Sequence, residues 1–153
     1  MKYKIVLSVC LVLLLIGCGK DSVLEPTNDK NTDIELKMIK ANTGMDQHIS
    51  NQAKELLSSY DAITSVKAVN DEKNLLTAIE VHHNKRFNLK KIQKELTKEL
   101  EKKFKNFHVE LTLDKKLVLE LDKLEKAMES GDISKKKLKK EIKKLTKLSK
   151  EQA

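Results

Sequence analysis

The hydrophobic and polar positions along the chain first predict a helix and a β-hairpin. Between residues 46 and 59, apolar side chains recur at helical spacing, and Asp46 can accept hydrogen bonds from the first free backbone amides. Residues 63–69 and 75–82 are rich in β-branched and aliphatic side chains, and the five residues between them are all polar. We therefore expect an amphipathic helix followed by two paired strands.

The same pattern then predicts two helices on either side of a third strand. Asn88 is the expected cap of the first of these helices, and residues 107–113 alternate between apolar and polar, which is typical of a strand with one buried face. Asp114 is expected to cap the next helix, and Gly131 to end it, because glycine tolerates a left-handed backbone. The apolar stripes of the two helices are Leu89, Ile92, Leu96, Leu100 and Phe104, and Leu117, Leu121, Leu124 and Met128.

These elements predict an α+β fold in the order α-β-β-α-β-α, followed by a basic helix. Three strands are not stable alone in water, so the helices are expected to cover one face of the sheet in a small two-layer sandwich. The crossover from the second to the third strand would be right-handed if these strands are parallel. The strand order stays open. In the second strand, Leu75, Thr77, Ile79 and Val81 share one face, with Leu76, Ala78, Glu80 and His82 opposite.

The N-terminus has the parts of a lipoprotein signal peptide. Two lysines precede an apolar run over residues 5–16, which is shorter than the roughly 20 residues that span a bilayer. We therefore expect residues 1–17 to be cleaved and the new N-terminal cysteine to carry diacylglycerol and acyl (palmitate) lipid, which holds the protein on a membrane. An ordinary secretory signal is the alternative. The expected lipobox is Leu15, Ile16 and Gly17, followed by the lipid attachment site Cys18.

Composition divides the rest of the chain into three parts. Residues 18–44 are mostly polar and include the single proline, so we expect a flexible tether, with a short strand or helix over residues 34–39 left open. Residues 45–130 form the expected domain, and residues 131–153 the basic helix. Cys10 lies in the leader and Cys18 carries lipid, which leaves the domain without a thiol or a disulfide.

The positive charge of the chain is concentrated at its C-terminal end. The formal net charge is +8, and residues 135–150 contain nine lysines against one glutamate, while the body is nearly neutral. Leucines at helical spacing among these lysines indicate a basic amphipathic helix, which either lies on an anionic surface or packs in the core with its lysines in water. The candidate surface contacts are Lys135, Lys136, Lys139, Lys140, Lys143, Lys144 and Lys147.

The sequence contains no set of residues that specifies a reaction. His82 and His83 are adjacent in an expected strand, so their side chains would point to opposite faces and not share a metal. The glutamates of the helix after Asn88 lie among lysines, and the pattern gives none of them the buried, specific partner that general acid or base catalysis needs. We therefore expect no enzyme, no metal and no cofactor besides the lipid. Nucleic acid is also disfavoured, because an exported lipoprotein with few aromatic residues rarely meets or stacks on it.

The chain resembles the YhcN/YlaJ sporulation lipoproteins of spore-forming Firmicutes. The resemblance rests on the lipobox, the polar tether, and the segments 53–57, 63–69, 76–81 and 107–112, with a helix that ends at Phe104. It implies a BON-like domain on a lipid anchor, associated with the spore membrane and with sporulation or germination, and it carries no catalytic residues. The second strand departs from the Tyr-Val-Ala-Val often found in the family, and the C-terminus is unusually rich in lysine.

We therefore predict a non-enzymatic lipoprotein of a Gram-positive bacterium, acting as a structural or adaptor module in sporulation or spore germination. It would lie on the extracytoplasmic face of the cell membrane or on the spore membrane, with an unknown protein partner. The alternative is an envelope binding module of vegetative cells, in which the basic helix engages anionic lipid or wall polymer.

Overall fold

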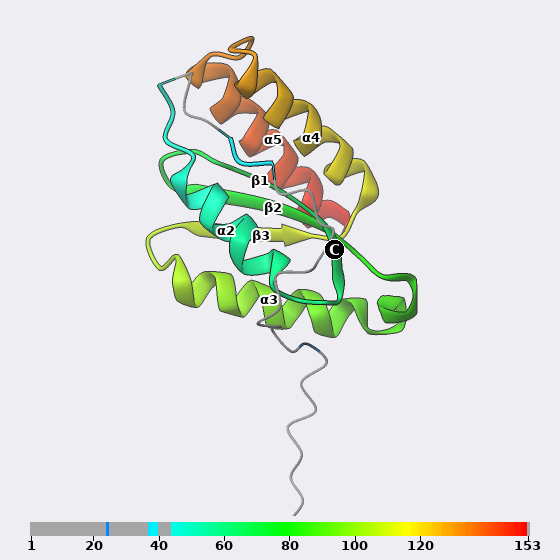
Figure 1. Ribbon diagram of the computed structural model, residues 1–153. Coiled ribbons are helices and arrows are strands. Elements are labelled where there is room, and N and C mark those ends of the chain that lie inside the picture. Colours follow the sequence, from blue (N-terminus) through cyan, green and yellow to red (C-terminus); the bar gives the residue numbers. More distant parts are fainter. Residues whose placement is uncertain (1–23, 25–36, 40–43, 153) are drawn as a thin grey trace, which may run out of the picture.

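The computed structural model of the protein describes Leu24, residues 37–39 and residues 44–152 (Figure 1). The predicted signal peptide 1–17, with Leu15, Ile16 and Gly17, and the predicted lipid site Cys18 lie outside the described residues.

The described elements confirm the predicted order, and one short helix is added. The 3₁₀ helix η1 precedes α3 and was not expected from the sequence. The elements are α2 (His48–Ser58), β1 (Ile63–Asn70), β2 (Asn74–Val81), η1 (His83–Asn88), α3 (Leu89–Lys103), β3 (His108–Thr112), α4 (Lys115–Glu129) and α5 (Lys135–Gln152).

The three strands form one mixed sheet in the order β1-β2-β3. The predicted hairpin is confirmed, since β1 and β2 are antiparallel with Ala68 opposite Thr77. Its turn is held by Asp71, whose Oδ1 accepts hydrogen bonds from the amides of Lys73 and Asn74, both at 2.8 Å. Strands β2 and β3 are parallel. Consequently β2 is the central strand, and β1 and β3 are the two edges.

Helices cover both faces of this sheet, which differs from the two-layer sandwich that we expected. Figure 1 shows α2 and α3 on one side of the sheet and α4 and α5 on the other. Leu75 and Ile79 pack in the core with α2 and α3, whereas Leu76 and Ala78 pack in the core with α4 and α5. The α+β class is confirmed. A second helix layer forms because β2 is apolar on both faces, and an uncovered apolar face would remain in water.

The residues that flank the helices decide whether the predicted helix caps form. Asp114 is extended, with φ −72° and ψ 122°, and its Oδ1 accepts hydrogen bonds from the amides of Lys116 at 2.7 Å and Leu117 at 3.0 Å. The expected cap at Asn88 is wrong, because Asn88 has ψ 17°, and its side chain makes no capping bond. Gly131 has φ 78° just after α4, as expected for a helix end.

Two apolar residues of the predicted tether are buried in the domain. Leu24 is 6% exposed and belongs to the core beneath α2 and α3, while Ile39 is 3% exposed and belongs to the other core. The amide and carbonyl of Ile39 both bond to the side chain of Asn51, each at 3.0 Å. At these residues the chain is docked, which differs from the expected tether, because isolated apolar side chains can dock even where the average composition is polar.

Removing the Asp114 side chain should destabilise the protein, whereas removing the Asn88 side chain should not. We expect Asp114→Ala to lower the free energy of unfolding by about 1 kcal/mol, because two amides of α4 lose their acceptor. Asn88→Ala is the matched control, since its side chain bonds to no helix amide. Urea unfolding of both variants measures the difference. Equal losses would show that the cap does not stabilise α4.

Candidate functional site

Helix α5 packs its apolar stripe into the domain. Leu138, Ile142 and Leu145 are each at most 3% exposed and belong to the core shared with α4 and the sheet. Near the end of the helix, Ser149 Oγ donates a hydrogen bond to Glu110 Oε1 of β3 at 2.7 Å. Of the two interpretations of the basic helix, the structure therefore agrees with core packing. Because the apolar stripe is buried, only the lysines of α5 are placed to contact an anionic surface.

The seven candidate lysines are all exposed, but they divide into two groups. Lys135 and Lys139 turn toward Glu72 in the β-hairpin turn, with Nζ to carboxylate distances of 2.7 and 3.7 Å. The hydrogen bond from Lys135 and the charges of both lysines lower the pKa of the Glu72 carboxyl. The charges of these two lysines are thus paired with Glu72 within the domain.

The other group forms what we call the lysine face of α5. At 100° per residue, these positions fall opposite or beside the line that faces the buried Leu138 and Ile142. Along the helix axis the group covers roughly 16 Å at 1.5 Å per residue. The lysine face consists of Lys136, Lys140, Lys143, Lys144 and Lys147.

Few carboxylates balance the lysine face. Lys144 lies 3.5 Å from Glu141, and Lys147 lies 3.7 Å from Glu151. Within the described part of the chain, no carboxylate lies within ion-pair distance of Lys136, Lys140 or Lys143. A shallow hollow runs between the lysines over Thr146, whose buried hydroxyl has no hydrogen-bond partner among the described residues. Such a surface can hold an anionic group between several ammonium groups.

A cavity of about 300 Å³ lies where the hairpin turn meets the start of α5. Met45, Ile49 and Phe107 supply apolar walls, and charged side chains form its rim. The rim carboxylates already have partners: Asp71 bonds to the turn amides and Glu72 to Lys135. Both of these carboxylates are therefore engaged within the domain.

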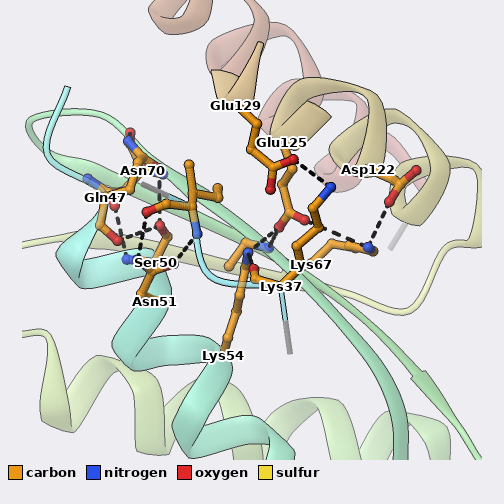
Figure 2. A network of polar contacts seen from close by, with 12 residues as sticks. Lys37, Gln47, Ser50, Asn51, Lys54, Lys67, Asn70, Asp122, Glu125 and Glu129 are labelled. Atoms are coloured by element: carbon orange, nitrogen blue, oxygen red, sulfur yellow. Dashed lines mark hydrogen bonds and ion pairs between the residues drawn. The ribbon is translucent and has the colours of Figure 1, made fainter. Parts of the chain in front are cut away.

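The most buried charges in the described structure join α2 to α4 (Figure 2). Lys54 Nζ lies 2.7 Å from Glu125 Oε1, and the two side chains are 1% and 2% exposed. Glu125 Oε1 also accepts a hydrogen bond from the Ala68 amide of the edge strand β1 at 2.9 Å. Lys54 Nζ donates to the Lys37 carbonyl at 2.7 Å. Burial lowers the pKa of Lys54, although Glu125 opposes this shift.

Further charges surround this pair at the outer edge of β1. Lys67 lies 2.7 Å from Asp122 and 3.7 Å from Glu125. Hydrogen bonds from Lys126 and Lys67 lower the pKa of the Asp122 carboxyl to about 2. Each of these charges has an opposite charge beside it. We interpret the cluster as a structural network.

Sequence reasoning missed this network, although one signal was present. Glu125 is four residues after Leu121 and three before Met128, so it lies within the buried stripe of its helix. Lys54 lies four residues after the buried Ser50 and three before the buried Leu57, so it too lies on the buried side of its helix. A charged residue in an apolar stripe indicates a buried partner, but the pattern does not name that partner.

The histidines are not placed as the sequence suggested. Strand β2 ends at Val81, so His82 lies after the strand and His83 begins η1, and both are exposed. The strand was expected to continue, but the chain turns into a 3₁₀ helix there. Within residues 44–152 and the other described positions, no group of three or more His, Cys, Asp or Glu side chains could hold a metal ion.

Comparisons with known proteins identify no relative. No protein-family model, curated protein or solved structure matches the chain. Among the described residues, none of the helices is both long enough and apolar enough to cross a bilayer.

Proposed function

We propose that this protein is a membrane-anchored, non-enzymatic lipoprotein that acts as a structural or adaptor module in sporulation or spore germination. Lipid on Cys18 attaches it to the membrane, and the lysine face of α5 binds an anionic partner. The observation that carries this proposal is the lysine face itself: a row of exposed lysines, three of them without a described carboxylate partner, on a helix whose apolar stripe is buried.

The physics of the lysine face favours an anionic partner. Like charges on one short helix repel one another, and a partner with closely spaced negative charges relieves this repulsion. At an anionic surface, each nearby lysine contributes about 1 kcal/mol of attraction. Because α5 is fixed to the core through Leu138, Ile142 and Leu145, the lysines are presented on a rigid support. Little ordering entropy is then lost on binding.

The rest of the proposal is supported by the sequence. The lipobox favours the anchor, and the resemblance to the YhcN/YlaJ lipoproteins favours a role in sporulation. The buried charges around Lys54 and Glu125 have partners of opposite charge, which favours a structural role over a catalytic one.

The second candidate function is an envelope binding module of vegetative cells. The lysine-rich α5 favours it, because this helix departs from the pattern of the family that the chain resembles. Both candidates use the same lysine face, and they differ in when the protein is made.

Binding to a polyanion should depend on the lysine face and not on the net charge alone. We expect the full chain in uncharged detergent to bind inorganic polyphosphate. Replacing Lys140, Lys143, Lys144 and Lys147 with Gln should weaken the affinity by roughly 1,000-fold, at about 1 kcal/mol per lysine. Titration calorimetry at several salt concentrations measures this, and binding should weaken as salt rises.

A matched control removes four positive charges elsewhere. Replacing Lys123, Lys126, Lys135 and Lys139 with Gln gives the same net charge, but each of these exposed lysines already lies within ion-pair distance of a carboxylate. This control should keep most of the affinity. Equal losses in the two variants would show that net charge, and not the lysine face, governs binding.

The stage of expression separates the two candidate functions. If the protein acts in sporulation or germination, its level should rise during sporulation, and deletion of its gene should lower spore yield or slow germination. Quantitative immunoblots through growth and spore germination assays measure both. Constant vegetative expression with unchanged spores would contradict the first function and favour the second.

A further inference from the structure

The side of the domain opposite α5 carries an exposed aromatic residue within a basic segment. Phe87 in η1 is 93% exposed, and no residue of η1 is buried. Lys85 and Arg86 precede it directly. A fully exposed phenylalanine is costly in water, and an aromatic ring beside cationic side chains is a typical contact at the boundary between headgroups and acyl chains.

A stripe of lysines continues from this segment along α3. Lys90, Lys94 and Lys98 are spaced four residues apart, so they lie on one side of the helix, and all three are exposed. The buried residues of α3 are Ile92, Leu96 and Leu100, which face the sheet. The lysine stripe therefore points away from the sheet, and the exposed Phe87 lies in η1, directly before this helix.

The predicted lipid site is only a few residues away in sequence from a residue that is buried beneath this layer. Leu24 is buried in the core beneath α2 and α3, and Cys18 precedes it by six positions. Six residues span about 20 Å when fully extended and about 13 Å as a flexible chain. A lipid on Cys18 would therefore hold the α2–α3 side of the domain near the membrane.

The lysine face of α5 lies on the far side of the sheet from Leu24. A helix with its side chains is about 10 Å thick, so the sheet and the α5 layer together place the lysine face roughly 20 Å from Leu24. Laying α5 flat on the membrane would require almost full extension of the six residues. Contact through η1 and α3 requires no such extension.

We propose that η1 and α3 form the surface that docks on the anionic membrane carrying the lipid anchor. Phe87 inserts at the boundary of headgroups and acyl chains, and Lys90, Lys94 and Lys98 contact the headgroups. The lysine face of α5 then points away from this membrane, toward an anionic partner on the other side of the protein. This inference rests on the lipid anchor at Cys18 in the proposed function.

The chain contains no tryptophan, so the fluorescence of a single introduced tryptophan reports which side of the domain meets the membrane. Phe87→Trp places a probe on η1. Leu119→Trp is the matched control, since Leu119 is also an exposed large apolar residue, 62% exposed, but lies on α4 in the opposite layer. The full lipidated chain is incorporated into vesicles of phosphatidylglycerol and phosphatidylcholine, with and without bromine on the acyl chains.

Brominated lipid should quench most of the emission of the Phe87→Trp chain and leave the emission of the Leu119→Trp chain almost unchanged. The emission of the Phe87→Trp chain should also shift to shorter wavelength when vesicles are added. Adding Lys90→Gln, Lys94→Gln and Lys98→Gln to this chain should reduce the quenching, and so should replacing phosphatidylglycerol with phosphatidylcholine.

The remaining outcomes separate this inference from the proposed function. If the Phe87→Trp chain floats with the vesicles but its emission stays unquenched, the docking surface is overturned while the anchor stands. If the Leu119→Trp chain is quenched instead, the α4–α5 side faces the membrane and the orientation is reversed. If neither chain floats with the vesicles, the anchor itself fails, and the docking surface fails with it.

Discussion

The architecture depends on one buried ion pair, Lys54 with Glu125, at the outer edge of β1. Helices α2 and α4 cover opposite faces of the sheet, and this pair joins them around the edge strand. The same two side chains also bond to the Ala68 amide and the Lys37 carbonyl. Burying two charges is costly, and attraction offsets this cost only where the remaining hydrogen bonds are made. Here those bonds close the strand edge and hold the docked segment 37–39.

With the β1 edge closed, the two helix layers supply the surfaces on which the proposed contacts rest. An open strand edge invites pairing with another chain, and the polar side chains along β1 occupy backbone groups that would otherwise be free, as Gln47 does at Asn70. One layer then presents Phe87 and the lysines of α3, and the other presents the lysine face of α5. A rigid domain with cationic surfaces on opposite sides suits an adaptor between a membrane and a second anionic partner.

The sequence predicted the features that depend on local patterns. Element order, the hairpin and the Asp114 cap follow from the spacing of neighbouring residues, whereas Asn88 failed as a cap because η1 changes its backbone. The second helix layer and the Lys54–Glu125 pair depend on contacts between distant segments, which periodicity does not report. The role of α5 was ambiguous because core packing and membrane binding require the same stripe of leucines. Leu24 and Ile39 were missed because each is an isolated apolar residue in a polar stretch.

A double-mutant cycle on Lys54 and Glu125 tests most directly whether this pair holds the layers together. Lys54→Met and Glu125→Gln should each lower the free energy of unfolding by about 3–5 kcal/mol. Glu125→Gln leaves the buried Lys54 ammonium without a carboxylate, and Lys54→Met leaves the buried Glu125 carboxylate with only the more distant Lys67, at 3.7 Å. The double variant contains neither charge and keeps an acceptor for the Ala68 amide. We expect it to recover part of the loss, with a coupling energy of about 1–3 kcal/mol measured by urea unfolding. Strictly additive losses would contradict the account.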